Sequence, residues 1–398
     1  MSMDENIKQL LELTRCALKN ETYDKQIYDE KQLFVIAQEN GLSVMITPLL
    51  KPSHLSTRFY DLFQKVFLQY TARDIRQKQA IQELKQLFND NGINHIFLKG
   101  SYLKQLYPAS FMRTMGDIDV LVQEANLDKV HSLLINNGYT NNTRSYQHDS
   151  YKKDKDIYVE VHARLESSSN DKYKALLAYA WDNSYVVDNY EYQLKPEFNL
   201  FYMLFHLMKH FNSSGVGLRS ILDIGIFVDS QNEFDLDYFD YLLDKSSLRL
   251  FFQNILYLNK MLFGFNKLTD IYLTDYIVDE GFINNLINYI IRSGVHGHGK
   301  DFNKHLTMVT KKTIDTGSVK KGKVRYIISL LFPNYNTMKD RYRFLTKLPI
   351  LLPLAWIFRI FNILFKKPRY SIKRFIQIIK TNKNEINMNY EIIKKLGI

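Results

Sequence analysis

The spacing of hydrophobic and polar residues changes twice along the chain of 398 residues. Up to about residue 90, apolar residues recur three and four positions apart, which predicts helices. Short apolar runs that stop at glycine, or that alternate with polar residues, then predict strands. Helical spacing returns at Lys195. The pattern therefore predicts a small sheet region with helical regions on both sides.

The predicted sheet region alternates strands and helices. Strands are expected at residues 95–100, 117–122 and 156–162, with helices at residues 101–108 and 125–139 between them. Such alternation within a short segment is typical of a compact α/β unit. The changes of pattern divide the chain into an N-terminal helical region, an α/β core, a helical domain and a basic, aromatic-rich C-terminal helical region, at residues 1–90, 91–190, 191–310 and 311–398.

Composition narrows the class of protein. Hydrophobic residues make up 45% of the chain and charged residues 24%, which indicates a globular protein rather than a disordered one. The single cysteine, Cys16, excludes an internal disulfide framework and is typical of a reducing compartment. The chain starts without an apolar signal segment, and no apolar stretch reaches the roughly 18 to 20 residues that span a bilayer. We therefore expect a cytoplasmic protein without disulfide partners.

The net charge of +11 is concentrated in the last quarter of the chain. Over residues 301–398, Lys and Arg outnumber Asp and Glu by 21 to 5. Within this block, residues 345–374 interleave aromatic, aliphatic and basic side chains. Three interpretations stay open: a helix packed on the core, a peripheral contact with anionic lipid at the inner membrane face, or a nucleic-acid contact.

Two carboxylates, Asp117 and Asp119, stand in an otherwise apolar predicted strand. Because alternate residues of a strand point to the same face, these side chains are expected to project together. Paired carboxylates bind hard cations such as Mg²⁺ or Mn²⁺. The turn at Gly100 and Ser101, between a strand and a helix, offers backbone N–H groups and a helix dipole to a phosphate. Together these features predict a two-metal site at which a hydroxyl attacks a nucleoside triphosphate.

Further candidates flank this motif or follow later in the chain. Arg113 and Gly116 precede the two acids, and a guanidinium there is suited to hold a phosphate through two hydrogen bonds. Lys99, in the first strand, is expected either at the surface or beside the site. His296 and His298, in a Gly/His-rich segment, are candidates for substrate contact or simply loop residues.

Two residue pairs on the predicted helices have the spacing of neighbours on one face. His206 and His210 are four residues apart, with Lys209 between them. We expect a structural pair or a nucleotide-facing edge there, with Lys209 near phosphate, rather than a transition-metal site. Arg219 and Asp223 have the same spacing, which predicts either an ion pair along the helix or a role facing the ligand.

The Gly-Ser turn followed by Asp-x-Asp resembles the signature of the DNA-polymerase-β nucleotidyltransferase superfamily. The fuller string over residues 98–122 is similar to a bacterial family of uncharacterised nucleotidyltransferases. Its members share a strand with an acid and then a histidine, here Glu160 and His162, a later helix pair like residues 206–224, and a stretch like residues 332–359. The resemblance covers most of the chain. It implies an α+β fold, in which helical regions flank a small mixed-sheet core of the polymerase-β kind.

The resemblance also implies roles for two further residues. Glu160 is expected as a third metal ligand or general base, and His162 as a residue that supports that site. The third acid of the superfamily is often Asp. Because Glu160 is one methylene longer, its direct contact with the metal stays open.

The activity that the resemblance implies is metal-dependent transfer of a nucleoside monophosphate from a nucleoside triphosphate to an acceptor hydroxyl. The family context suggests surface-polysaccharide biosynthesis, with a glycan or a lipid-linked sugar as the acceptor. Two alternatives stay open. One is a toxin-like nucleotidyltransferase that modifies tRNA or protein. The other is a non-catalytic nucleotide-binding or scaffold protein on the same fold.

Overall fold

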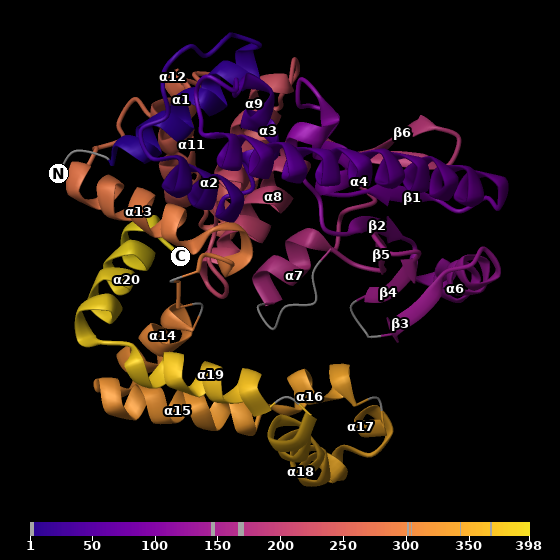
Figure 1. The fold of residues 1–398 in the computed structure, drawn as a ribbon. Coiled ribbons are helices and arrows are strands. Elements are labelled where there is room, and N and C mark those ends of the chain that lie inside the picture. Colours follow the sequence, from indigo (N-terminus) through magenta and orange to yellow (C-terminus); the bar gives the residue numbers. More distant parts are fainter. Residues whose placement is uncertain are drawn as a thin grey trace.

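Figure 1 shows the chain in a computed structural model, with a sheet on one side and helices grouped on the other. The structure describes residues 4–144, 148–165, 171–300, 302–303, 305–342, 344–366 and 368–398.

Helices form the N-terminal region, as the hydrophobic spacing predicts. They are α1 (Glu5–Lys19), α2 (Glu30–Glu39), α3 (Ser43–Ile46) and the 34-residue α4 (Thr57–Asp90). The carboxylates of Asp4 and Asp29 accept hydrogen bonds from backbone N–H groups in the first turns of α1 and α2, which satisfies donors that a helix start leaves unpaired. The C-terminal half of α4 runs along the sheet (Figure 1).

The described strands form one mixed sheet of seven strands in the order β3-β4-β5-β2-β1-β7-β6. Strand β2 is parallel to β5, strand β1 is parallel to β7, and the other neighbouring pairs are antiparallel. The strands are β1 (His95–Phe97), β2 (Ile118–Val122), β3 (Thr140–Arg144), β4 (His148–Lys153), β5 (Ile157–His162), β6 (Ser184–Asp188) and β7 (Glu191–Leu194).

Each face of the sheet is covered by a different set of helices. On one face, Ile118, Val120 and Val122 of β2 pack in a core with α4 and α6 (Leu127–Asn136). On the other face, Ile96 and Leu121 belong to the larger core that includes α8 (Pro196–Phe211). Because side chains alternate along a strand, Asp119 lies on the α8 face together with Leu121. The alternation in β2 therefore directs the acid away from α4 and toward the helical domain.

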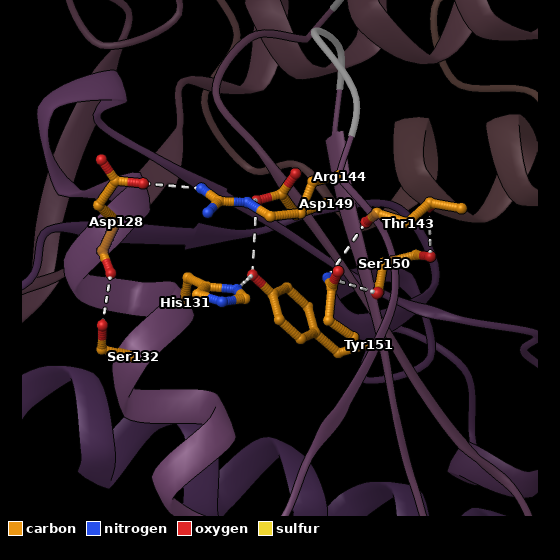
Figure 2. Close-up of polar contacts among 9 residues, drawn as sticks. Asp128, His131, Ser132, Thr143, Arg144, Asp149, Ser150 and Tyr151 are labelled. Carbon is orange, nitrogen blue, oxygen red and sulfur yellow. Dashed lines mark hydrogen bonds and ion pairs between the residues drawn. The ribbon is translucent and has the colours of Figure 1, made fainter. Parts of the chain in front are cut away.

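The hairpin of β3 and β4 is fastened to α6 by polar side chains, which Figure 2 shows. The Arg144 guanidinium donates to Asp149 on the neighbouring strand at 3.0 Å and to Asp128 on α6 at 2.7 Å. The Tyr151 hydroxyl lies 3.0 Å from His131 Nδ1 and donates to Asp149 at 3.5 Å. Hydrogen bonds between side chains thus join the β3–β4 edge of the sheet to α6, because the polar strand β3 offers few apolar residues for packing.

The helical domain follows the sheet and packs on its α8 face. Among its helices, α11 (Arg249–Phe263) is capped by Gly264, whose φ of +82° is a conformation that glycine adopts at little cost. Besides α8 and α11, its helices are α9 (Leu218–Ser230), α10 (Leu236–Ser246), α12 (Thr269–Tyr272) and α13 (Glu280–Ser293); α7 (Asp171–Leu177) lies earlier in the chain, between β5 and β6.

The C-terminal region forms the lower edge of the molecule in Figure 1 and has small cores of its own. The last helix returns to the helical domain: Leu396 is part of the large core, and Lys395 pairs with Asp279 at 2.6 Å. The helices are α14 (Leu306–Thr316), α15 (Val319–Leu331), α16 (Tyr335–Arg341), α17 (Phe344–Lys347), α18 (Leu352–Phe361), α19 (Pro368–Lys380) and α20 (Lys383–Leu396).

The expected fold class is confirmed at the level of a mixed sheet flanked by helices. The pattern missed β3, β4, β6 and β7. Strand β3 (Thr140–Arg144) is polar throughout, and β6 and β7 are short strands around a turn, so none has a clear apolar alternation. Among the residues that the structure describes, no helix combines the length and the apolar character needed to cross a bilayer.

Candidate active site

Strand register places the predicted acids next to one another. Because β2 and β5 pair in parallel, Asp119 lies directly opposite Glu160, and Leu121 lies opposite His162. Strand β4 adds His148 opposite His162 on the far side of β5. Carboxylates and imidazoles from three adjacent strands therefore gather on the sheet face that meets α8.

Asp119 is the most tightly held of these acids. Its Oδ1 atom accepts hydrogen bonds from Lys99 Nζ at 3.0 Å and from His162 Nε2 at 2.9 Å. Burial alone would raise the pKa of Asp119, but the charge of Lys99 and the contact with His162 hold that pKa well below its usual range. Asp119 is thus a preorganised carboxylate that stays ionised at neutral pH.

The turn after β1 brings Lys99 and Gly100 to the site in different ways. Lys99 has a φ of +45°, a conformation that is unfavourable for a residue with a side chain, and its ammonium group reaches Asp119. A Cβ atom on Gly100 would lie 2.7 Å from both Arg113 Nη1 and Met115 Sδ, so glycine is needed here for close packing. Ser101 is buried, with its hydroxyl 3.6 Å from the Met115 sulfur.

The helix after this turn is shorter than the sequence predicts. Helix α5 (Gly100–Leu103) has only four residues, where residues 101–108 were expected to be helical. So short a helix contributes little dipole for binding an anion, and any phosphate bound at this turn would rely on the backbone of Gly100 rather than on a long helix.

A cavity of about 600 Å³ opens in front of these residues. The sheet supplies one wall, α8 and α9 supply another, and residues of α2 and α4 close a third side. The polar and glycine residues in its lining are Gln38, Glu39, Gly41, Tyr70, Arg73, Lys99, Gly100, Arg113, Thr114, Gly116, Asp117, Asp119, Glu160, Tyr202, His206, His210, Arg219, Ser220, Asp223 and His298.

Asp117 faces the cavity from a more exposed position, one residue before β2 begins. Burial, and then the negative charges of Glu160 and Asp119, raise the pKa of Asp117 above its ordinary value. The Arg73 guanidinium, which donates to the backbone carbonyl of Gly116 at 2.8 Å, acts in the opposite direction. Three carboxylates close enough to repel one another are the electrostatic environment that a bound cation would relieve.

The residues present fit a divalent cation. One ligand atom each from Asp119, Glu160 and His162 lies within 4.8 Å of the other two. The two carboxylates supply oxygen donors of the kind that Mg²⁺ and Mn²⁺ prefer, while His162 is placed to orient Asp119. The position of Lys99 Nζ shows that positive charge is already favoured against Asp119. Asp117 lies outside this group of three.

The far wall of the cavity contains a buried ion pair that differs from the expected one. Asp223 accepts two hydrogen bonds from Arg113, at 2.8 and 2.9 Å, and a third from the Tyr107 hydroxyl at 2.7 Å. Arg219, the helical neighbour expected to pair with Asp223, instead donates to the carbonyl and hydroxyl of Thr114, at 2.9 and 2.7 Å. Burial, and then the nearby charge of Arg113, lower the pKa of Arg219. Arg113 is thus paired directly with Asp223, whereas Arg219 donates to the uncharged oxygens of Thr114.

The two helical histidines do lie side by side on the cavity wall. Their Nε2 atoms are 2.9 Å apart, and His210 Nδ1 lies 2.9 Å from the Ser214 hydroxyl. Lys209 is exposed and lies outside the lining of the cavity. His298 is part of the lining, whereas the side chain of His296 lies outside the described residues.

Residues of the N-terminal helices are the part of the site that the sequence did not indicate. Glu39 at the end of α2, together with Tyr70 and Arg73 on α4, lines the same cavity. They have no motif around them, and they precede the acids by dozens of residues. The only signal available was that Arg73 is a cation on a long amphipathic helix, which is common on a solvated surface.

Comparison with known proteins agrees with this geometry. A family model described as uncharacterised nucleotidyltransferase matches residues 28–264, more than half of the chain, including every strand of the sheet. No curated protein and no solved structure matches the chain. Nucleotidyltransferases generally use divalent metals, in agreement with the cluster of Asp119, Glu160 and His162. The chain therefore belongs to the uncharacterised nucleotidyltransferase family, and its general function is nucleotidyl transfer.

Proposed function

We propose that the protein transfers a nucleoside monophosphate from a nucleoside triphosphate to an acceptor hydroxyl in this cavity. The observation that carries the proposal is the convergence of Asp117, Asp119 and Glu160 with Gly100 on a single cavity of about 600 Å³. A cavity of this size is within the usual range for a small-molecule site. Packing alone gives no reason to place three carboxylates on one wall of it.

Mg²⁺ or Mn²⁺ would be held by Asp117, Asp119 and Glu160. When bound there, such ions favour ionisation of the attacking hydroxyl and neutralise charge on the departing pyrophosphate. The protein's own part is to keep Asp119 ionised and oriented, through the 2.9 Å contact with His162 and the 3.0 Å contact with Lys99. Without these two partners, the Asp119 carboxylate would be free to rotate and would more readily take up a proton.

The phosphates would be bound by Arg73 and Arg219. Arg113 already has a full counter-charge in Asp223, which leaves it little capacity for an anion. Among the residues that the structure describes, Nε of Arg73 and Nε of Arg219 are buried without a hydrogen-bond partner. Both guanidiniums line the cavity. A triphosphate would supply the acceptors that these donors lack, and burial strengthens such charge-assisted hydrogen bonds.

For the acceptor we propose a glycan or lipid-linked sugar of surface-polysaccharide biosynthesis, which the family resemblance of the sequence supports. The lining is mixed in polarity, with Tyr202 and Leu207 beside His206 and Ser220, and it can contact both the apolar face and the hydroxyls of a sugar. A tRNA or a protein hydroxyl is the competing acceptor.

The test is transfer of α-labelled nucleotide. The protein is incubated with each nucleoside triphosphate and Mg²⁺ or Mn²⁺ in a cell extract, and pyrophosphate release and labelled products are measured. We expect activity in the wild type and a loss of at least about a thousandfold in Asp119→Asn, because charge stabilisation at the metal is removed. Asp237→Asn, an exposed acid on α10, is the matched control and should keep full activity.

Titration with Mn²⁺, followed by electron paramagnetic resonance, gives a readout that does not depend on turnover. The wild type and Asp237→Asn should bind Mn²⁺ similarly, and Asp119→Asn should bind it more weakly. Equal turnover in Asp119→Asn and the wild type would contradict the proposal. A wild type that binds nucleotide but releases no pyrophosphate with any acceptor would favour the scaffold alternative. Label on tRNA or protein would refute the glycan acceptor alone.

A further inference from the structure

Exposed apolar side chains are concentrated in the C-terminal helices. Among the side chains that the structure describes, 32 large hydrophobic residues are exposed, and 14 of them lie between residues 324 and 379. That segment is about one seventh of the chain, yet it holds nearly half of the exposed large hydrophobic residues that the structure describes. Scattered exposed apolar residues are normal on a soluble protein, but a concentration of this kind marks an interaction surface.

Helix α18 and the π-helical turn η6 (Asn362–Lys366) after it carry the strongest part of this surface. Ile357, Phe361 and Phe365 are 62%, 56% and 67% exposed, and their spacing of four residues places them along one helical face. The opposite face is packed: Ala355 is buried, and the Trp356 indole donates to the carbonyl of Pro333 at 2.8 Å. The helix is therefore held in place with an apolar face directed to solvent.

The neighbouring helices α15 and α19 repeat the pattern. Exposed apolar residues follow at intervals of three or four, which is the spacing of one helical face. On α15 and its C-cap they are Val324, Ile328 and Phe332, and on α19 they are Ile372, Ile376 and Ile379. Helix α15 contacts α18, and helix α19 contacts η6. We call the exposed apolar residues of α15, α18, η6 and α19 together the C-terminal apolar surface.

Basic residues far outnumber acidic ones along the C-terminal apolar surface: from Val319 to Lys380 the chain has 15 Lys and Arg and one acid, Asp340. Between Asp340 and Glu385 the chain contains no acidic residue, whereas residues 341–384 contain 11 Lys and Arg. Lys347, Lys380 and Lys383 are among those that the structure shows as exposed. Apolar residues among a large excess of positive charge are complementary to the interface of an anionic bilayer, where acyl chains lie beneath negative headgroups.

We propose that the C-terminal apolar surface binds the interfacial zone of an anionic lipid bilayer. Helix α18 lies in the plane of the headgroups, the phenylalanine and isoleucine side chains insert below them, and the lysines contact lipid phosphates. A nucleic acid fits less well, because it offers phosphates to the lysines but nothing to cover the aliphatic residues. The inference is independent of the proposed function, since it uses no residue of the cavity.

Flotation with lipid vesicles tests this proposal on the full chain. Vesicles of phosphatidylcholine alone are compared with vesicles that contain about one third phosphatidylglycerol, at about 0.1 M salt. We expect the wild type to float only with the anionic vesicles. The variant with Ile357→Ser, Phe361→Ser and Phe365→Ser should bind at least about tenfold more weakly, because three apolar side chains no longer insert. Its circular dichroism and its turnover in solution should match the wild type.

A second variant tests how much the positive charge contributes to vesicle binding, and a third serves as the control. Lys347→Glu with Lys380→Glu should weaken binding to anionic vesicles at least about twentyfold, because each lysine near the surface contributes a factor of about five. Ile277→Ser, which alters an 89% exposed isoleucine in the helical domain, is the matched control and should float like the wild type.

Several outcomes would overturn the proposal. They are a wild type that floats with neither kind of vesicle, or a serine variant that floats as well as the wild type. Retention of tRNA in preference to anionic vesicles at equal salt would assign the surface to nucleic acid instead. A dimer that dissociates in the serine variant, without vesicle binding by the wild type, would assign it to a second copy of the chain.

Discussion

Replacing Asp223 by Asn should destabilise the protein strongly. The carboxylate accepts two hydrogen bonds from Arg113 and one from Tyr107, and all three side chains are buried. Asn keeps the size but removes the charge, so the Arg113 guanidinium stays buried without a counter-ion. Breaking a buried pair from one side generally costs about 3–5 kcal/mol in the free energy of unfolding. We expect a value in that range.

The structure also predicts that replacing Arg113 and replacing Asp223 lower the free energy of unfolding by different amounts. In Arg113→Met, Asp223 keeps the Tyr107 hydrogen bond and the attraction of the Arg219 charge. In Asp223→Asn, both Arg113 and Arg219 lose their nearest negative charge. Arg113→Met should therefore cost less than Asp223→Asn, by about 1.5–3 kcal/mol, the scale of one charge-assisted hydrogen bond.

Urea unfolding followed by far-UV circular dichroism measures these differences. The double variant Arg113→Met with Asp223→Leu should be less destabilised than the sum of the single variants, because no charge is left unpaired. The reasoning is refuted if Asp223→Asn costs less than about 1 kcal/mol, or if Arg113→Met is the more damaging change. Additive effects in the double variant would show that the pair does not act as a unit.

Three other changes test the site and the sheet edge. In steady-state kinetics, Arg73→Ala should raise KM for the nucleotide about tenfold or more, with a smaller effect on kcat, because a phosphate-binding guanidinium is lost. The control is Arg76→Ala, which alters an arginine one turn along α4 that pairs with Asp156. Gly100→Ala should lower the melting temperature in calorimetry and reduce activity, since its Cβ would force aside Arg113 or Met115 at a cost of about 1–3 kcal/mol. Arg144→Ala should speed hydrogen exchange in β3 and β4 relative to β5, because buried Asp149 loses its positively charged partner.

The ion-pair partner of Asp223 on the cavity wall could not be predicted from the spacing of residues along the helix. Arg219 and Asp223 have the spacing of an ion pair within one helix, but Arg113 approaches Asp223 from a different segment and binds it with two hydrogen bonds. The planar guanidinium matches a carboxylate best in this two-pronged geometry, which neighbours on one helix reach less easily. The tertiary structure therefore pairs Arg113 with a carboxylate and leaves Arg219, on the same cavity wall, with the uncharged oxygens of Thr114 as its hydrogen-bond partners.

The sequence alone located three of the described strands and indicated the candidate chemistry of the site. Apolar alternation and a glycine stop located β1, β2 and β5, and two acids in an apolar strand identified the candidate metal site, because these signals lie within a few residues of each other. Only the tertiary structure placed Glu160 opposite Asp119, brought Arg73 to the cavity and left the face of α18 exposed. Those relations join segments that are distant along the chain, and strand register and helix packing, rather than local periodicity, decide them.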